Sequence, residues 1–471
     1  MPGLVIRSAE VASARTDVRI EAGRIAALGP ALEAEPGDSV LEARGGALLP
    51  GLHDHHLHLL AWAAALGSVR CGPPEVQSER ALAAALRAAA VPGSAAAERS
   101  AFVRGVGYHE SVAGELDRAR LDAFLPHVPL LIQHRTCSLW MLNSAACRRF
   151  GLDDGVDAPG VERDARGRAS GRLFRLDAWL RERLGDEALP ALAPVGAALT
   201  RYGVTGVTDA TPALGPAALA ALVSAAGGGA LPQRLVLLGA DAAAAAPLEV
   251  GPEKLVLDER ALPPLAELVG RVRAAHACER AVAIHCVTRT ELVLALAALE
   301  EVGPRAGDRI EHASVAPPEL AAWLARLGVA VVTQPGFVRS RGDAYLREVE
   351  GRDRAWLYRC AGFDAAGVPL GAGTDAPFGE PDPWLAMQAA VDRRTAAGER
   401  LGAGEALSPE RALALFTTSA AAPGGAPRRI AQGARADLCL LDRPWARARD
   451  ALASDAVAAT LGAGRLLWQR G

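Results

Sequence analysis

The chain has 471 residues, of which 50% are hydrophobic, and its formal net charge at pH 7 is −3. This length exceeds what one small core needs and favours one large α/β barrel or two to three domains. The balanced charge argues against a basic nucleic-acid surface and against an acidic tail, so small molecules are the expected partners.

The first residues lack a basic segment followed by a long apolar run, and the chain has no uninterrupted apolar stretch of about 18 residues. The seven cysteines are scattered and never spaced Cys-x-x-Cys, which argues against a disulfide framework or a structural zinc knuckle. We therefore expect a cytoplasmic protein with a small-molecule substrate and without nucleic-acid or membrane partners. We also expect it to be a homodimer.

Both chain ends are predicted to build one small β-sandwich. Residues 1–48 contain short apolar runs separated by turn residues, among them LVIRSAEV and TDVRIEAGRIAALGP, and residues 428–471 return to this style with RRIAQGARADLCLLDRP and LGAGRLLWQRG. The intervening residues 49–427 are predicted to form the catalytic domain. Strands and helices do not alternate regularly within about residues 60–200, so we expect an insertion there.

From about residue 200 onward, short apolar runs alternate with longer segments of helical period. The runs are GVTGVTDAT, QRLVLLGAD, EKLVLDE, AVAIHC, DRIEHAS, VAVVTQP and GVPLGAGTDAP. With GALLPGLHDHHLHLL as the first strand, the count reaches eight. Repeated strand–helix units imply parallel strands, so the predicted fold class is α/β, a (β/α)8 TIM barrel with the β-sandwich attached.

Four of the ten histidines lie within six positions, in the segment GLHDHHLHLL. Strand alternation places Asp54, His56 and His58 on one face, and His53 and His55 on the other. Two imidazoles at i and i+2 on a strand can bind the same metal ion, and a nearby carboxylate can fix the tautomer of a ligating ring. This pattern alone does not separate a metal site from a surface cluster.

Three further side chains stand where predicted strands end. His285 follows AVAI, His312 ends RIEH, and Asp375 ends PLGAGTD. Because an α/β barrel forms its active site at the carboxyl ends of its strands, these side chains should converge at one mouth. Core packing explains such a set poorly.

Lys254 is the only lysine in the chain. Period 2 places it on one face of the fourth barrel strand with Val256 and Asp258, and we expect that face to point inward. Burial lowers the pKa of an amine, so that its neutral form can react, whereas guanidinium stays charged. With CO2 such an amine forms a carbamate, whose two oxygens can bridge two metal ions. The alternative is an ordinary ion-pairing lysine.

The order of these motifs resembles the amidohydrolase superfamily and, within it, amidohydrolase family 3, the YtcJ-like metal-dependent hydrolases. PGLHDHHLH is similar to the Pro-Gly-x-x-Asp-x-His-x-His opening of that superfamily, and EKLVLDE, VAIHC, RIEHAS and GAGTDAP follow in its order. Further support comes from VRGVGYHES, VPLLIQHRTCSLWMLNSAAC and IAQGARADLCLLD. The resemblance covers nearly the whole chain, and the chain departs from it in having histidines at positions 53 and 55.

The resemblance implies two divalent metal ions, expected to be Zn²⁺, bridged by N-carboxylated Lys254. It assigns one pair of histidines to each ion and makes Asp375 both a ligand and a proton shuttle. The implied metal ligands are His56, His58, Lys254, His285, His312 and Asp375. The implied reaction is hydrolysis of a non-peptide C–N bond in an amide, N-substituted formamide or cyclic amide. Lys254 and Asp375 are the implied catalytic residues.

Candidate substrate-binding residues lie in two places. His134, Arg135 and Trp140 belong to the expected insertion, whereas Gln334 and Arg339 follow the seventh barrel strand. Loops after barrel strands commonly determine specificity, and arginine can bind a carboxylate in bidentate fashion.

Two other functions stay open. Lys254 could form a Schiff base, as in a lyase or aldolase, although that chemistry leaves the histidines without a role. A non-catalytic binding protein on an amidohydrolase-like scaffold is the other alternative, because a fold alone does not establish a function. The presence of both Lys254 and Asp375 argues against it.

Overall fold

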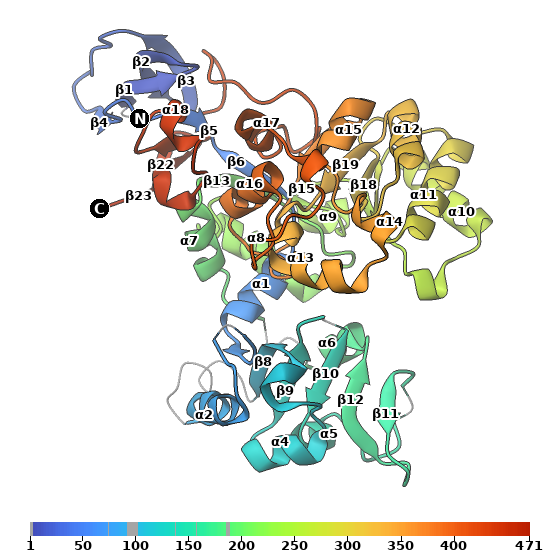
Figure 1. Cartoon of the computed structure of the whole chain (residues 1–471). Coiled ribbons are helices and arrows are strands. Elements are labelled where there is room, and N and C mark those ends of the chain that lie inside the picture. Colours follow the sequence, from blue (N-terminus) through green and yellow to red (C-terminus); the bar gives the residue numbers. More distant parts are fainter. Residues whose placement is uncertain (1–2, 74, 92–101, 137, 157, 185–188) are drawn as a thin grey trace. The chain divides into compact units, whose positions relative to one another are not determined.

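The computed structural model describes residues 3–73, 75–91, 102–136, 138–156, 158–184 and 189–471. The chain divides into two compact units, which are described separately (Figure 1). The first consists of Met1–Leu59 with Leu192–Gly471, and the second of Leu60–Ala191.

Two parallel sheets form the centre of the first unit. One has the strand order β15-β14-β13-β6, and the other has the order β16-β17-β18-β19-β20. Their bounds are Leu52–Leu57 (β6), Val204–Asp209 (β13), Arg234–Leu237 (β14), Glu249–Val250 (β15), Glu253–Val256 (β16), Val282–Cys286 (β17), Arg309–His312 (β18), Ala330–Thr333 (β19) and Leu370–Ala372 (β20). The predicted α/β class with parallel strands is therefore confirmed, and strands lie at all the predicted apolar runs.

Strand pairing among the described residues joins neither β15 to β16 nor β20 to β6. At the second of these gaps, however, the backbones still meet. The amide of Asp375 donates to the carbonyl of His56 at 2.8 Å, and the amide of His58 donates to the carbonyl of Ala376 at 2.9 Å. The two sheets are thus linked by hydrogen bonds at the carboxyl ends of β6 and β20.

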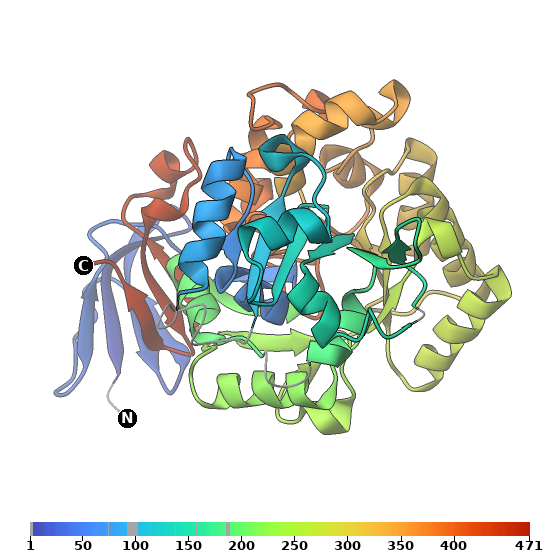
Figure 2. The same ribbon diagram turned by 90° about the horizontal axis from the view of Figure 1, so that it is seen from below.

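Helices connect most of the successive parallel strands, although none lies between β15 and β16. α10 and α11 pack against β17 and lie outside the strands in both ribbon views (Figures 1 and 2). Strands covered in this way are buried on both faces, which explains their nearly continuous apolar sequences. The helices of this unit are Ala193–Arg201 (α7), Pro216–Gly227 (α8), Ala242–Ala245 (α9), Leu265–Ala277 (α10), Arg289–Val302 (α11), Pro318–Leu327 (α12), Gly336–Glu348 (α13), Gly351–Arg354 (α14), Ala361–Ala366 (α15), Pro383–Asp392 (α16), Pro409–Ala414 (α17) and Trp445–Ala448 (α18).

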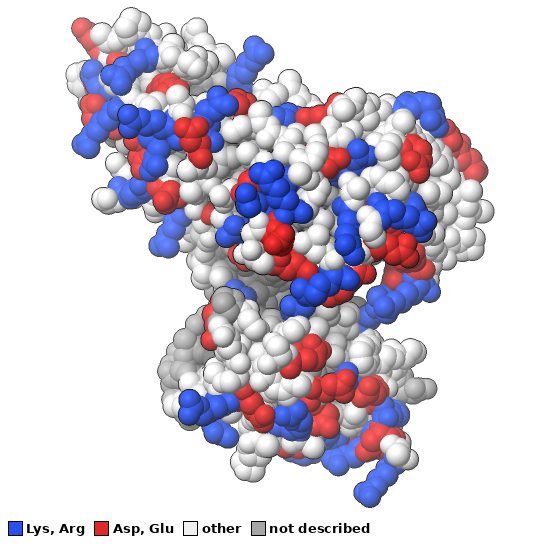
Figure 3. Space-filling view, in the orientation of Figure 1, with Lys and Arg blue, Asp and Glu red and all other residues white. Residues whose placement is uncertain are grey.

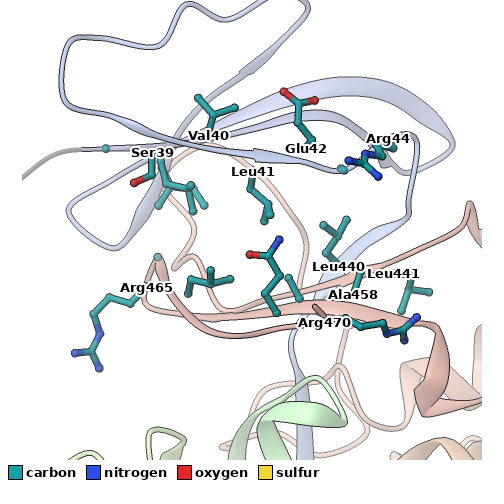
Figure 4. A pocket seen from close by; sticks show the side chains of 18 of the residues that line it. Ser39, Val40, Leu41, Glu42, Arg44, Leu440, Leu441, Ala458, Arg465 and Arg470 are labelled. Atoms are coloured by element: carbon teal, nitrogen blue, oxygen red, sulfur yellow. The ribbon is translucent and has the colours of Figure 1, made fainter.

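The chain ends form two further four-stranded sheets, with orders β3-β2-β1-β4 and β23-β22-β21-β5. Side chains of both sheets share one buried apolar cluster that includes Ile6, Val18, Leu438 and Leu461. An open groove of about 1110 Å³ also lies between them (Figure 4). The strands are Leu4–Val11 (β1), Ala14–Glu21 (β2), Arg24–Gly29 (β3), Ser39–Glu42 (β4), Leu48–Pro50 (β5), Leu438–Leu441 (β21), Val457–Gly462 (β22) and Arg465–Gln469 (β23).

The segment GALLPGLHDHHLHLL does not form the single strand that the sequence predicts. It forms two strands, of which β5 pairs with β21 in a terminal sheet and β6 pairs with β13 in a parallel sheet. Gly51 stands between them, where a Cβ would lie 2.3 Å from Thr205 Cγ2. The chain passes from one sheet to the other at a position where only glycine fits.

The second unit contains a six-stranded sheet with the order β11-β12-β10-β9-β8-β7. Its strands are Val69–Arg70 (β7), Val103–Tyr108 (β8), Leu130–His134 (β9), Leu139–Leu142 (β10), Val161–Arg163 (β11) and Ala169–Phe174 (β12). Two separate apolar clusters form its core. Its helices are α1, which begins at the unit boundary (Leu59–Leu66), Glu79–Ala89 (α2), Glu110–Ala113 (α3), Arg118–Phe124 (α4), Ser144–Arg149 (α5) and Asp177–Leu184 (α6).

The surface carries charges of both signs. On the face drawn in Figure 3, basic and acidic side chains are interspersed. Among the described residues, no helix has the length and apolar character needed to span a membrane.

Candidate metal centre

Four of the predicted histidines come together at the carboxyl ends of three parallel strands. His56 and His58 lie at the end of β6, His285 on β17 and His312 at the end of β18. Ring centroids are separated by 5.4 Å for His56 and His58, 4.7 Å for His56 and His312, and 4.5 Å for His285 and His312. The imidazoles therefore form one contiguous cluster, although they are far apart in the sequence.

Asp375 adds a carboxylate to this cluster. Its Oδ1 lies 3.6 Å from Nε2 of His56 and 3.3 Å from Nε2 of His58. One ligand atom from each of His56, His312 and Asp375 lies within 4.8 Å of the others, and all three residues are buried. Nitrogen and carboxylate ligands at such spacing are the donor set that zinc prefers.

Lys254 lies on β16, where it is 7% exposed, and the neighbouring Leu255 and Leu257 are also buried. Its Nζ is buried and has no hydrogen-bond partner among the described residues. Val256, predicted to share the inward face, is 45% exposed at the end of the strand. Burial lowers the pKa of the Lys254 amine, opposed in part by the negative charge of Glu311. This shift favours the neutral amine, which is the form that reacts.

The outer nitrogens of three imidazoles are held by other side chains. Nδ1 of His58 lies 3.2 Å from Thr211 Oγ1, and Nδ1 of His312 lies 2.6 Å from Gln334 Oε1. Nδ1 of His56 contacts the carboxylate of Glu311. Carbonyl and carboxylate oxygens accept hydrogen bonds, so they favour the tautomer with Nδ1 protonated and Nε2 free to bind a metal ion.

The loop after β20 is held against β6 by Asp54. The Asp54 carboxylate accepts hydrogen bonds from the Thr374 hydroxyl at 2.5 Å, from the Thr374 amide at 3.1 Å and from the His56 amide at 3.1 Å. A Cβ at Gly373 would lie 2.5 Å from the amide nitrogen of His56. Close backbone approach and a buried carboxylate thus position Asp375 beside the histidines.

Backbone strain is concentrated at the same place. His312, Ala313 and Asp375 have φ values of 69°, 44° and 56°, in the left-handed region that non-glycine residues rarely adopt. Such conformations cost on the order of 1–3 kcal/mol each and occur often at functional sites. The strand ends that carry His312 and Asp375 are therefore held in unfavourable conformations by their surroundings.

Comparison with known proteins assigns the family. Residues 39–467 match the model of the amidohydrolase family. The chain belongs to this family. It is 27% identical, over 494 residues and 90% of each chain, to N-substituted formamide deformylase from Arthrobacter pascens. It is 30% identical over 187 residues to the putative amidohydrolase YtcJ of Bacillus subtilis strain 168, which covers 37% of this chain and 35% of that protein.

A solved structure shares the fold of this amidohydrolase. It is the crystal structure of an uncharacterized metal-dependent hydrolase from Pyrococcus horikoshii OT3, with a TM-score of 0.74 and 20% sequence identity. The match covers 94% of this chain and 97% of that chain. The family predicted from the sequence motifs is thus confirmed. The protein is an enzyme of the amidohydrolase family.

The two histidines in which this amidohydrolase departs from the family motif have partners outside the histidine cluster. His53 Nε2 lies 2.9 Å from Thr208 Oγ1, and His55 Nε2 lies 2.8 Å from Thr418 Oγ1. Both rings are buried, and their centroids are 4.6 Å apart. Burial lowers the pKa of His55 to about 3, so its ring is neutral at physiological pH. The strand alternation predicted from the sequence separates these rings from His56 and His58.

Gln334 and Arg339 lie in the first unit, and their substrate-binding role stays a prediction. Gln334 is fully buried, with Oε1 at His312 Nδ1 and Nε2 donating to the Val332 carbonyl at 3.2 Å. Its contacts make it a support for His312. Arg339 lies half-buried on α13.

The other predicted substrate contacts belong to the second unit. His134 is buried at the end of β9, with Nε2 3.1 Å from Glu110 Oε2. Trp140 is buried on β10 and donates from Nε1 to Asp177 at 2.8 Å. Arg135 directly follows β9. A substrate-binding role for these three residues stays a prediction.

Sequence reasoning missed Glu311 and Arg309. Both are fully buried on β18, and Arg309 Nε donates to Glu311 Oε1 at 2.5 Å. A signal was present, because RIEH places two opposite charges in a strand whose neighbours are apolar. Their contact with β6, however, cannot be read from local sequence.

Proposed function

We propose that this amidohydrolase cleaves a non-peptide C–N bond by hydrolysis at a centre of two divalent ions, with zinc as the expected metal. The observation that carries the proposal is the buried amine of Lys254, which has no hydrogen-bond partner among the described residues and whose charge acts on His56 and His285. A buried amine without a hydrogen bond is costly, so it calls for a partner. Carboxylation of Nζ by CO2 would provide one by turning the amine into an anion.

The chain's own residues fit such a centre. We assign His56 and His58 to one ion and His285 and His312 to the other, with N-carboxylated Lys254 between them and Asp375 as a further ligand. When bound, the ions would lower the pKa of water from 15.7 to about 7 and polarise a carbonyl. Burial lowers the pKa of His56 and His312, which favours the neutral imidazoles that metal binding requires.

Asp375 would move the proton in this reaction. Its carboxylate lies at the edge of the histidine cluster, within 3.3 Å of His58 Nε2. In this position it can accept a proton from the attacking water and deliver it to the leaving nitrogen. The strained backbone at Asp375 is in keeping with a role that demands a defined carboxylate position.

We also propose that the two parallel sheets form one closed (β/α)8 barrel from the eight strands at the predicted apolar runs, with the two-residue strand β15 in addition. Arg309 and Glu311 on β18 reach His55 and His56 on β6, although β18 and β6 are neighbours in neither sheet. These contacts support the proposal that the two sheets share one interior. The catalytic domain of residues 49–427, the insertion within about residues 60–200 and the β-sandwich of residues 1–48 plus 428–471 belong to the same proposal.

The proposed substrate class is a small amide, with N-substituted formamides as the first candidates because a relative with 90% coverage is a deformylase of that class. The test is a panel of N-substituted formamides, other N-acyl compounds, hydantoins and aminopyrimidines, assayed with zinc-loaded enzyme and with chelator-treated enzyme. Metal-dependent release of an amine from one compound class is expected. Borohydride-trapped substrate on Lys254 together with metal-independent turnover would instead support a Schiff-base enzyme.

A further inference from the structure

Glu311 connects the proposed metal centre to a buried arginine. Its side chain is 0% exposed, and its two carboxylate oxygens have different partners. Oε1 accepts from Arg309 Nε at 2.5 Å, whereas Oε2 contacts Nδ1 of His56. Arg309 is 1% exposed and donates from Nη2 to the carbonyl of His55 at 3.2 Å.

This arrangement favours one tautomer of the His56 imidazole. A carboxylate accepts hydrogen bonds and cannot donate them, so the imidazole nitrogen that faces Glu311 must carry the proton. The other nitrogen, Nε2, then presents its lone pair toward Asp375, whose Oδ1 lies 3.6 Å away. Arg309 holds the carboxylate from the opposite side and balances its charge, which makes burial of Glu311 tolerable.

We infer that Glu311 is a positioning residue of the metal centre, which holds His56 as an Nε2 ligand through a buried hydrogen bond and is itself held by Arg309. The inference rests on the proposed metal-dependent function. Neither Glu311 nor Arg309 belongs to the ligand set proposed above. Mutation of residues that hold a metal ligand in this way typically lowers metal affinity or activity by about 10- to 100-fold.

The test compares zinc affinity of apoenzyme variants by competition with a chromophoric zinc chelator. Glu311→Gln keeps the shape of the side chain but removes the negative charge, and we expect it to weaken zinc binding by about 10- to 100-fold. The matched control is Glu405→Gln. Glu405 is also a buried carboxylate paired with an arginine, Arg359, at 2.8 Å, and none of its hydrogen-bond partners among the described residues is a histidine. The control should bind zinc as tightly as the wild-type enzyme.

A purely structural role would lower the thermal stability of both variants and leave zinc affinity unchanged, and that result would overturn the inference. If Glu311→Gln fails to fold, the inference is tested instead by determining the tautomer of His56 in the wild-type apoenzyme. Long-range ¹H–¹⁵N spectra of histidine-labelled protein, with His56→Asn for assignment, should show Nδ1 protonated, and an Nε2-protonated ring would contradict the inference. Wild-type enzyme that binds no zinc would refute the proposed function instead.

Discussion

The backbone amide of Asp375 donates a 2.8 Å hydrogen bond to the backbone carbonyl of His56. This bond joins the end of the last parallel strand to the first, and it places a carboxylate beside two imidazoles. The backbones can approach this closely because residue 373 is glycine. Geometry at the proposed metal centre therefore depends on main-chain contacts as well as on the ligands.

Gly373→Ala should disturb this contact. The added Cβ would lie 2.5 Å from the His56 amide nitrogen, so β6 and the loop that carries Asp375 must separate. A misplacement of about 1 Å can reduce turnover by about 100-fold. We expect a loss of that order in kcat/KM together with weaker zinc binding. Gly215→Ala is the matched control, since a Cβ there meets nothing within 4 Å. Equal activity of both variants would contradict the prediction.

Lys254→Arg tests the carboxylated lysine. If Lys254 served only as a cation, arginine would be the mildest replacement, because the chain has no other lysine and uses arginine at its other basic positions. A bridging carbamate, in contrast, would be exchanged for a fixed positive charge beside two metal ions, where like charges repel strongly. Metal content and turnover should then fall together. Lys254→Ala should be partly rescued by an added short carboxylate, and an active, metal-replete Lys254→Arg enzyme would refute the bridge.

Asp375→Asn separates metal binding from proton transfer. The amide keeps the size of the side chain but cannot accept the proton of the attacking water. General acid–base groups contribute about 10²- to 10⁴-fold to rate, so kcat should fall by that range while much of the zinc remains bound. Steady-state kinetics and elemental analysis of the same preparation provide the two readouts. Near-native kcat would remove Asp375 from this role.

Two histidine pairs that share one bridging ligand predict two metal ions per chain. Enzyme produced with added zinc should contain close to two zinc ions per chain by elemental analysis. Prolonged dialysis against a chelator should abolish turnover, and zinc should restore it. A reproducible content near one ion per chain with full activity would rule out the bridged centre.

An ion pair between the buried Arg118 and the exposed Asp153 in the second unit predicts a pH dependence of stability. Arg118 is 5% exposed and binds both oxygens of Asp153 at 2.6 and 2.7 Å. The guanidinium hydrogen bond lowers the pKa of Asp153 below its usual value of 3.8. The stabilisation is therefore present above the unfolded-state pKa and is lost as the pH falls through the lower, folded-state pKa.

Asp153→Asn should consequently destabilise the protein by about 1 kcal/mol near pH 7, because the exposure of Asp153 screens the pair and exposed ion pairs contribute about 0–1 kcal/mol. The difference from the wild-type enzyme should shrink below pH 4. Glu79→Gln is the control, since Glu79 pairs with Arg120 at the surface, where ion pairs contribute about 0–1 kcal/mol. Urea unfolding at both pH values measures the effect, and a difference independent of pH would contradict the assignment.

Local sequence was sufficient to predict the main strands and helices of the first unit. Runs such as VAIHC and RIEH form strands because β-branched and apolar residues suit a buried parallel sheet. A helix begins directly after Ser408, whose side chain accepts from the Arg411 amide. The alternation along β6 also separated His53 and His55 from His56 and His58, since side chains on a strand alternate between faces.

Only the tertiary structure decided which of these residues touch. That Glu311 contacts His56, that Gln334 holds His312, and that Gly51 divides a predicted strand between two sheets all depend on segments distant in sequence. Local periodicity reports the face on which a side chain lies, but not what packs opposite that face. Those partners are set by strand order, backbone approach and burial, which act on the folded chain as a whole.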